Sequence, residues 1–199
     1  MHWLDAPPAG TPVCGGFDGS EVDDATVIRL ETRDGFQFTP RYGPDRRPTI
    51  WLPAEWGDVT PRAEVHAAWA EIVKTYRVQR VYCDPFKWAT ELDGWSLEYG
   101  EDVFIEWRTN RPRQMFEALD RFQVDLAAKA FRHDGCPITA QHVANAIRIA
   151  RSSDTYILGK PAQHLKIDAG VTSVLAHEAA CDARAAGWLD VTTSYAYVF

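Results

Sequence analysis

VCGGFDGSEVDDATVIRLET, residues 13–32, is the stretch of this sequence that decides the fold. Two largely apolar runs, 13–18 and 25–32, are separated by a polar turn at 21–24, which predicts two strands. The pair Asp34-Gly35 then favours a hairpin turn into a third strand at 36–39. The first of these strands ends on a carboxylate, Asp18.

Two further aspartates stand at the ends of predicted elements. Residues 78–83 form an apolar strand that ends at Asp84-Pro85, where the proline stops the strand. Asp168 opens an Ala-rich helix that is expected to run to about Ala186 and to stop at Gly187. Carboxylates from such distant positions can meet only through the fold, and when they meet they repel one another unless a divalent cation is bound. We therefore expect Asp18, Asp84 and Asp168 to form a magnesium-type site for phosphodiester chemistry.

Helices are expected to cover the strands. Thr60-Pro61 is a strong helix start, with threonine as the cap and proline at the first helical position. Trp69 lies on the apolar face of this helix and is interpreted as a core residue. Further predicted elements are a short helix at 88–92, a strand at 103–107, a helix from Pro112 to about Ala130, a helix at 138–149 with Thr139 as a candidate cap, and a strand at 155–158. This order predicts an α/β fold with a mixed sheet flanked by helices.

The length of 199 residues predicts one domain at 13–187, with a lead-in or linker at 1–12 and a tail at 188–199. No stretch approaches the roughly 18 uninterrupted apolar residues of a membrane span. No GxxxxGK[ST] motif occurs, so no P-loop ATPase site is expected. The four cysteines form no CxxC pair and are interpreted as free thiols, so a zinc site is not expected.

Charge gives a mixed indication about DNA. The net charge of −7 argues mildly against a strong standalone DNA binder. Two arginine-rich loops could nevertheless track a phosphate backbone, although charged loops are usually only solvated. These loops contain Arg41, Arg46 and Arg47, and Arg108, Arg111 and Arg113.

Other polar residues have competing interpretations. Asp23 and Asp24 are interpreted as residues of a solvated turn. The alternative for Asp24 is an auxiliary ligand of the metal site. His164 and His177 could shuttle protons, but surface or core positions are favoured for both.

The motifs now described resemble the C-terminal nuclease domain of a tailed-phage terminase large subunit, a ribonuclease H-like fold. The opening hairpin, residues 16–28, and the strand-end segment VYCDP, residues 81–85, are similar to the family's first and second aspartate motifs. The most specific match is KIDAGVTSVLA, residues 166–176, with its Lys-x-Asp-Ala start. Asn145 and Lys160 also fit the family pattern.

The resemblance implies a metal-dependent endodeoxyribonuclease that cuts concatemeric double-stranded DNA in the host bacterial cytoplasm. Asp18 would bridge two Mg²⁺ or Mn²⁺ ions about 4 Å apart, and Asp84 and Asp168 would each complete one ion's shell. The implied partners are DNA, a packaging ATPase domain that this chain lacks, the phage portal and the small terminase subunit, with no membrane. The alternatives are a Holliday-junction resolvase or transposase, or a non-catalytic module that docks on a portal or an ATPase.

Overall fold

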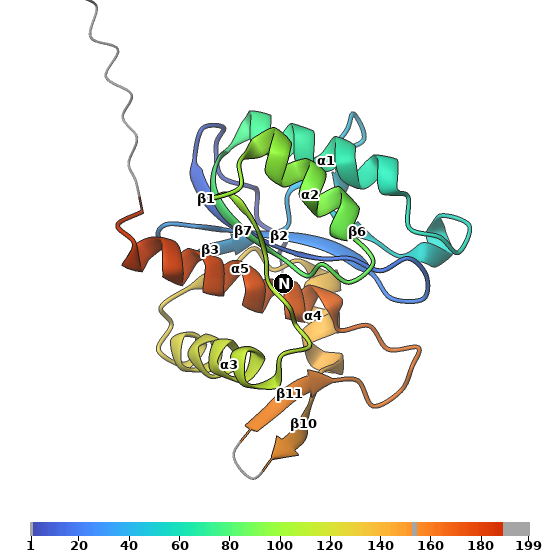
Figure 1. Ribbon diagram of the computed structural model, residues 1–199, viewed down its shortest axis with the longest axis vertical. Helices are drawn as coiled ribbons and strands as arrows, with labels where there is room; N and C mark the ends of the chain where they lie inside the picture. Colours follow the sequence, from blue (N-terminus) through green and yellow to red (C-terminus); the bar gives the residue numbers. More distant parts are fainter. Residues whose placement is uncertain (1, 153–154, 189–199) are drawn as a thin grey trace, which may run out of the picture.

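The computed structural model describes residues 2–152 and 155–188, and over these ranges the chain forms a mixed sheet with helices on both faces (Figure 1). The sheet order is β8-β7-β1-β2-β3-β9, with β6 also paired to β2. The expected α/β fold with a mixed sheet is therefore confirmed. The strands of this sheet are β1 (Pro12–Asp18), β2 (Thr26–Thr32), β3 (Phe36–Phe38), β6 (Ile50–Trp51), β7 (Arg77–Cys83), β8 (Phe104–Glu106) and β9 (Arg132–His133).

Five α-helices in the described residues form the two outer layers: α1 (Arg62–Thr75), α2 (Ala89–Tyr99), α3 (Pro112–Ala127), α4 (Pro137–Asn145) and α5 (Asp168–Ala185). Helices α1 and α2 cover one face of the sheet, while α5 crosses the other face with α3 and α4 beyond it (Figure 1). The remaining elements are a 3-10 turn, η1 (Pro53–Glu55), and two small hairpins, β4 (Arg41–Tyr42) with β5 (Arg47–Pro48) and β10 (Ile147–Ser152) with β11 (Thr155–Gly159).

Strand β1 lies at the centre of the sheet and contributes buried side chains to both of its faces. Its side chains alternate, so that Phe17 packs with α1 and α2 while Cys14 packs with α3 and α5. Phe17 meets the rings of Trp88 and Trp95 edge-on, each at a centroid distance of 5.1 Å. Trp69 is fully buried in the same aromatic cluster, as expected from the sequence.

Gly16 in β1 allows α5 to approach the sheet closely. A Cβ atom at Gly16 would lie 2.4 Å from the carbonyl oxygen of Thr172 and 2.7 Å from the backbone nitrogen of Ala176. Both are backbone atoms of α5, so the helix lies directly on the glycine. The close contact fixes the distance between the carboxyl end of β1 and the amino end of α5.

Several sequence-based predictions of helix boundaries are wrong, including the short helix predicted at 88–92, which is observed as α2 and runs on to Tyr99. Helix α1 begins at Arg62, and the hydroxyl of Thr60 does not cap it but shares a hydrogen bond of 3.3 Å with Thr26 in β2. The predicted helix at 138–149 ends at Asn145, and the following residues form β10, paired with β11. Thr139 is not the cap either, because α4 begins at Pro137.

The ends of the described chain pack against the domain. The backbone of Leu4 donates to the carbonyl of Asp134 at 2.7 Å, so part of the predicted lead-in is bound to the domain. Trp188, at the start of the predicted tail, is buried beside α3 and α5, and residues 189–199 lie outside the described residues. No helix among the described residues is both long and apolar enough to cross a membrane.

Candidate active site

Asp18 and Asp84 are brought together by the pairing of β1 with β7. The two strands are parallel, with Phe17 opposite Cys83. Asp18 is the last residue of β1, and Asp84 comes directly after β7. The backbone N–H of Asp84 donates to the carbonyl of Phe17 at 3.0 Å, which extends the pairing to the aspartate itself. Carboxyl ends of neighbouring parallel strands meet at one edge of a sheet, and this is where α/β proteins commonly bind ligands.

Helix α5 supplies the third aspartate. Asp168 is its first residue, and the close approach at Gly16 holds this end of the helix over the end of β1. The backbone N–H of Ala25 donates to the Asp168 carboxylate at 3.3 Å, so the start of β2 also fixes its position.

A cleft of about 400 Å³ contains all three carboxylates. Its lining residues come from the ends of β1 and β7, the turn before β2, the loop after β8 and the start of α5. They are Asp18, Gly19, Ser20, Asp24, Ala25, Asp84, Phe86, Thr109, Asn110 and Asp168. The structure thus places the three aspartates around one cleft, whereas their role as metal ligands stays a prediction.

The carboxylates destabilise one another's ionised forms. Burial, followed by the charges of Asp168, Asp84 and Asp24, raises the pKa of Asp18 well above its usual range. Burial and the charge of Asp24 also raise the pKa of Asp168. A cation in the cleft would remove this repulsion and hold the carboxylates ionised.

Asp24 is the residue that the sequence interpretation undervalued. The turn between β1 and β2 points it into the cleft, whereas its neighbour Asp23 is exposed as expected. Its carboxylate is paired with Lys160 and, at 3.2 Å, with Lys166. Asp24 therefore forms a fourth acidic group in the cleft, held by two lysines that come from the segment before α5.

Thr109 was not singled out from the sequence. Its hydroxyl donates a hydrogen bond to Oδ2 of Asp84, and Oδ1 of the same carboxylate accepts from the backbone N–H of Phe86 at 3.1 Å. Both oxygens of Asp84 are thus oriented by neighbouring groups. A threonine in a polar loop carries no sequence signal for such a role.

The two arginine-rich loops lie differently with respect to the cleft. Thr109 and Asn110, next to Arg108, line it, so the loop that holds Arg108 and Arg111 borders the site, whereas Arg113 lies in the first turn of α3 and not in the loop. Arg108 pairs with Glu106 at 2.5 Å, and Arg113 pairs with Glu117 at 3.0 Å.

The other loop is turned toward different surfaces. Arg41 stacks on Trp3 at 4.0 Å, Arg47 stacks on Trp56 at 5.2 Å, and Arg46 is mostly exposed. Arg41, Arg46 and Arg47 are not among the described residues that line the acidic cleft. Phosphate contacts by either loop stay a prediction.

The two histidines considered from the sequence do not line the cleft. His164 is exposed, and His177 is buried in contact with Glu31 and Asp125. His142, which sequence analysis did not single out, instead accepts a hydrogen bond from the backbone N–H of Ala169 at 3.1 Å, at the start of α5.

Solved structures with a similar fold include phage terminases. The large terminase of bacteriophage HK97 matches with a TM-score of 0.65 and 15% identity, over 88% of this chain and 40% of that protein. The large terminase nuclease of thermophilic phage G20c, solved with bound magnesium, matches with a TM-score of 0.63 and 12% identity, over 89% of this chain and 90% of that one. The chain has the fold of a large-terminase nuclease domain. The resemblance inferred from the sequence, including the ribonuclease H-like sheet, is confirmed at the level of the fold.

A curated relative also comes from a phage. The Gene 13 protein of Mycobacterium phage D29 is 29% identical over 185 residues, which cover 87% of this chain. The same match covers 30% of the relative, so this terminase-like chain spans about a third of the length of that protein. No family model matches the chain.

Proposed function

We propose that this chain is the nuclease domain of a phage large terminase subunit and that it hydrolyses double-stranded concatemeric DNA with divalent metal ions. The single observation that carries the proposal is the convergence of Asp18, Asp84 and Asp168 on one cleft of this fold. The fold match to terminase nucleases supports the reaction class, and the repulsion among the carboxylates supports the metal.

The cleft fits cations of the magnesium type. Its candidate ligands are all carboxylate oxygens, which hard cations such as Mg²⁺ and Mn²⁺ prefer to sulfur or imidazole. In this proposal Asp18, Asp84 and Asp168 would hold two such ions, with Asp18 as a ligand of both and Asp84 and Asp168 each as a ligand of one. When bound, ions of this kind would supply activation of a water molecule and stabilisation of the negative charge on a departing oxygen.

Neighbouring residues position two of these ligands. Thr109 and the backbone of Phe86 orient the Asp84 carboxylate, and the backbone of Ala25 orients that of Asp168. Lys160 and Lys166 offset the charge of Asp24, which keeps a fourth carboxylate beside the site without adding its full repulsion.

A protein nucleophile is not needed for this chemistry. Ser20 carries a hydroxyl at the cleft, but that hydroxyl donates to the carbonyl of Val22 at 2.6 Å. No described residue that lines the cleft is a histidine or a cysteine, so Ser20 is not part of a Ser-His or Cys-His pair there. Water is therefore the nucleophile that we propose.

The proposed partners follow from this assignment. They are double-stranded DNA, a packaging ATPase domain, the phage portal and the small terminase subunit, and the proposed location is the host bacterial cytoplasm. Two alternatives differ in how they would use the site. A Holliday-junction resolvase or a transposase would use the same carboxylates on a different nucleic acid, and a docking module would use none of them.

Nicking of supercoiled plasmid DNA tests the proposal. Cleavage is expected with Mg²⁺ or Mn²⁺ and should stop in excess EDTA. Asp168→Asn keeps the side-chain volume but removes a ligand charge, so it should lower the nicking rate by at least about 10²-fold. Asp93→Asn, an exposed carboxylate on α2, is the matched control and should cut normally.

Three results would contradict the proposal in different ways. Undiminished cutting in EDTA would show that cleavage needs no divalent metal. Symmetric cutting restricted to four-way junctions would favour the resolvase. Absence of both cleavage and Mn²⁺ binding would favour the docking module.

A further inference from the structure

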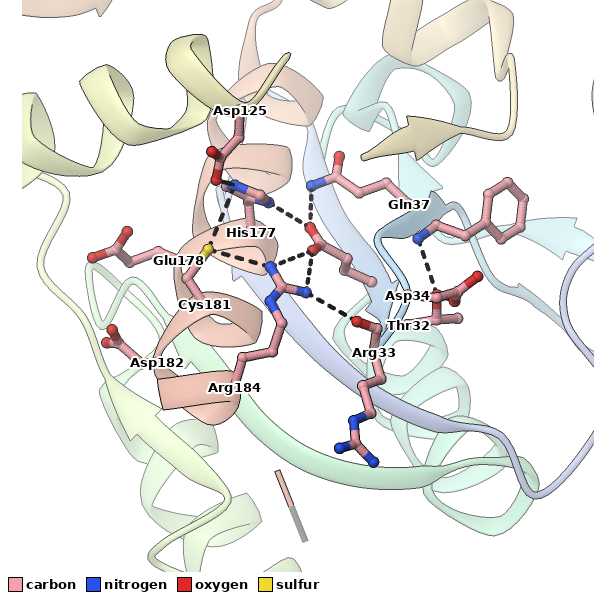
Figure 2. Close-up of polar contacts among 12 residues, drawn as sticks. Thr32, Arg33, Asp34, Gln37, Asp125, His177, Glu178, Cys181, Asp182 and Arg184 are labelled. Atoms are coloured by element: carbon pink, nitrogen blue, oxygen red, sulfur yellow. Dashed lines mark hydrogen bonds and ion pairs between the residues drawn. The ribbon is translucent and has the colours of Figure 1, made fainter. Parts of the chain in front are cut away.

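A second group of potential metal ligands lies between α3 and α5 (Figure 2). Asp125 of α3 and His177 and Cys181 of α5 point toward one another there. His177 follows Asp168 by nine residues in the same helix, which is about 13 Å along the axis at 1.5 Å per residue. The group, called here the α3–α5 cluster, shares no residue with the cleft.

The spacing in the sequence suits a metal ligand pair. His177 and Cys181 are four residues apart in one helix, so they lie one above the other on the same face. Asp125 reaches the pair from a neighbouring helix, 52 residues earlier in the chain. Because the ligands come from two helices, the sequence contains no CxxC-type signal, and zinc was not expected from the cysteine pattern.

The distances in the α3–α5 cluster approach those of a tetrahedral site. Nε2 of His177 lies 2.9 Å from Oδ2 of Asp125 and 3.5 Å from Sγ of Cys181, and the three candidate ligand atoms lie within 4.8 Å of one another. Zinc bonds of about 2.0–2.1 Å to nitrogen and oxygen and about 2.3 Å to sulfur, at tetrahedral angles, require separations of about 3.3 Å and 3.5 Å. The Asp125 side chain is 31% exposed, so it has room to adjust its distance to the other two ligands.

The second ring nitrogen of His177, Nδ1, contacts a carboxylate, as it does in many metal sites. Its Nδ1 lies 2.9 Å from Oε2 of the fully buried Glu31, and the amide of Gln37 donates to the same oxygen at 2.9 Å. A carboxylate at Nδ1 keeps a proton there, so a metal ion would take the place of the proton that Nε2 shares with Asp125. The direction of His177 is thus set from β2 and β3, independently of Asp125 and Cys181.

Arg184 completes the charge balance. Its guanidinium donates to Oε1 of Glu31 at 3.0 Å and to Sγ of Cys181 at 3.2 Å. The charges of Arg184 and Glu31 cancel, so the Asp125 carboxylate and a Cys181 thiolate would together neutralise one divalent ion. The site would be electrically neutral when it is loaded.

We propose that Asp125, His177 and Cys181 bind one transition-metal ion of the zinc type, which fastens α3 to α5 and keeps one coordination position for water. A nitrogen, a sulfur and an oxygen ligand select such a metal, in contrast to the all-oxygen cleft. Binding does not depend on nuclease activity, so the two proposals can fail separately.

Titration of the metal-free protein with Co²⁺ tests this site. A Co²⁺ ion bound to a thiolate shows sulfur-to-metal charge-transfer absorption in the near ultraviolet, which an all-oxygen site cannot produce. One equivalent of Co²⁺ should give this absorption, Zn²⁺ should displace it, and Asp168→Asn should leave it unchanged. Cys181→Ser should abolish it.

Paired variants of α3 provide the control. Asp125→Asn should weaken Co²⁺ binding by at least about tenfold, whereas Asp120→Asn, an exposed carboxylate on the same helix, should not change it. Circular dichroism verifies that each variant is folded, and Asp125→Asn decides the matter if Cys181→Ser does not fold. Wild-type protein without the charge-transfer absorption would overturn the proposal, as would absorption that survives in folded Cys181→Ser or binding unaltered in Asp125→Asn.

Discussion

Replacing Gly16 with alanine should separate the two halves of the acidic cleft. A Cβ atom would lie 2.4 Å from the Thr172 carbonyl oxygen, while ordinary contact begins at 3.4 Å, so α5 must move away from β1 by about 1 Å. The atoms in contact belong to the helix backbone and cannot rotate aside. Asp168, as the first residue of α5, would move with the helix and away from Asp18.

The expected effect has a stability part and an activity part. Inserting a methyl group into packed structure costs about 1–3 kcal/mol in the free energy of unfolding. Displacement of a catalytic group by about 1 Å can cost about 10²-fold in rate. Gly16→Ala should therefore unfold at lower urea concentration and nick plasmid DNA roughly 10²-fold more slowly, even at concentrations of Mg²⁺ that saturate the wild type.

Gly94→Ala is the matched control. Gly94 lies inside α2, and a Cβ atom added to it would have no neighbouring atom within 4 Å, so alanine meets open space there. Alanine favours helix by about 0.5–1 kcal/mol over glycine, so this variant should be slightly more stable and should cut normally. A Gly16→Ala variant with wild-type stability and nicking rate would refute the argument that close packing at this glycine sets the geometry of the site.

Three further predictions concern DNA binding, the threonine beside the cleft and pH. Replacing Arg46 and Arg47 with alanine should weaken DNA binding for all sequences and flatten its salt dependence, whereas an unchanged salt slope would assign that loop to solvent. Thr109→Val removes the hydroxyl that orients a cleft carboxylate and should slow nicking about 10–100-fold while stability stays near that of the wild type, which activity assays and urea melts together check. In EDTA, the raised pKa values of Asp18 and Asp168 mean that the folded protein binds protons more tightly than the unfolded chain does. This contribution to the free energy of unfolding should therefore increase as pH falls toward the ordinary aspartate pKa of about 4. Urea melts at several pH values should show a smaller increase in Asp168→Asn, and an equal increase in both proteins would contradict this assignment.

Local patterns in the sequence were sufficient to predict the elements that form the sheet. The strands that end near Asp18 and Asp84 and the helix that begins at Asp168 all carry apolar runs bounded by turn or proline signals. The segment after Asn145 was assigned to a helix because its isoleucines fit either period over so short a run. Pairing with β11, a tertiary contact, makes it a strand.

The candidate site was predicted less completely than the fold. Asp24 has the local sequence of a solvated turn, and its ion pairs with Lys160 and Lys166 come from far along the chain. Thr109 and the α3–α5 cluster depend likewise on contacts between distant segments. Such groups leave no periodic signal, so a single sequence does not indicate them.

The order of the three aspartates along the chain has a consequence for biosynthesis. Asp18 and Asp84 lie on neighbouring strands, but the carboxylate that closes the cleft comes at position 168, on a helix that must dock across β1. At a translation rate of about 5–20 residues per second, at least ~4 s separate the second carboxylate from the third. During this interval a nascent chain holds two of the three proposed ligands, so a nuclease built in this way would acquire its cutting activity only after α5 has been synthesised and has docked on the sheet.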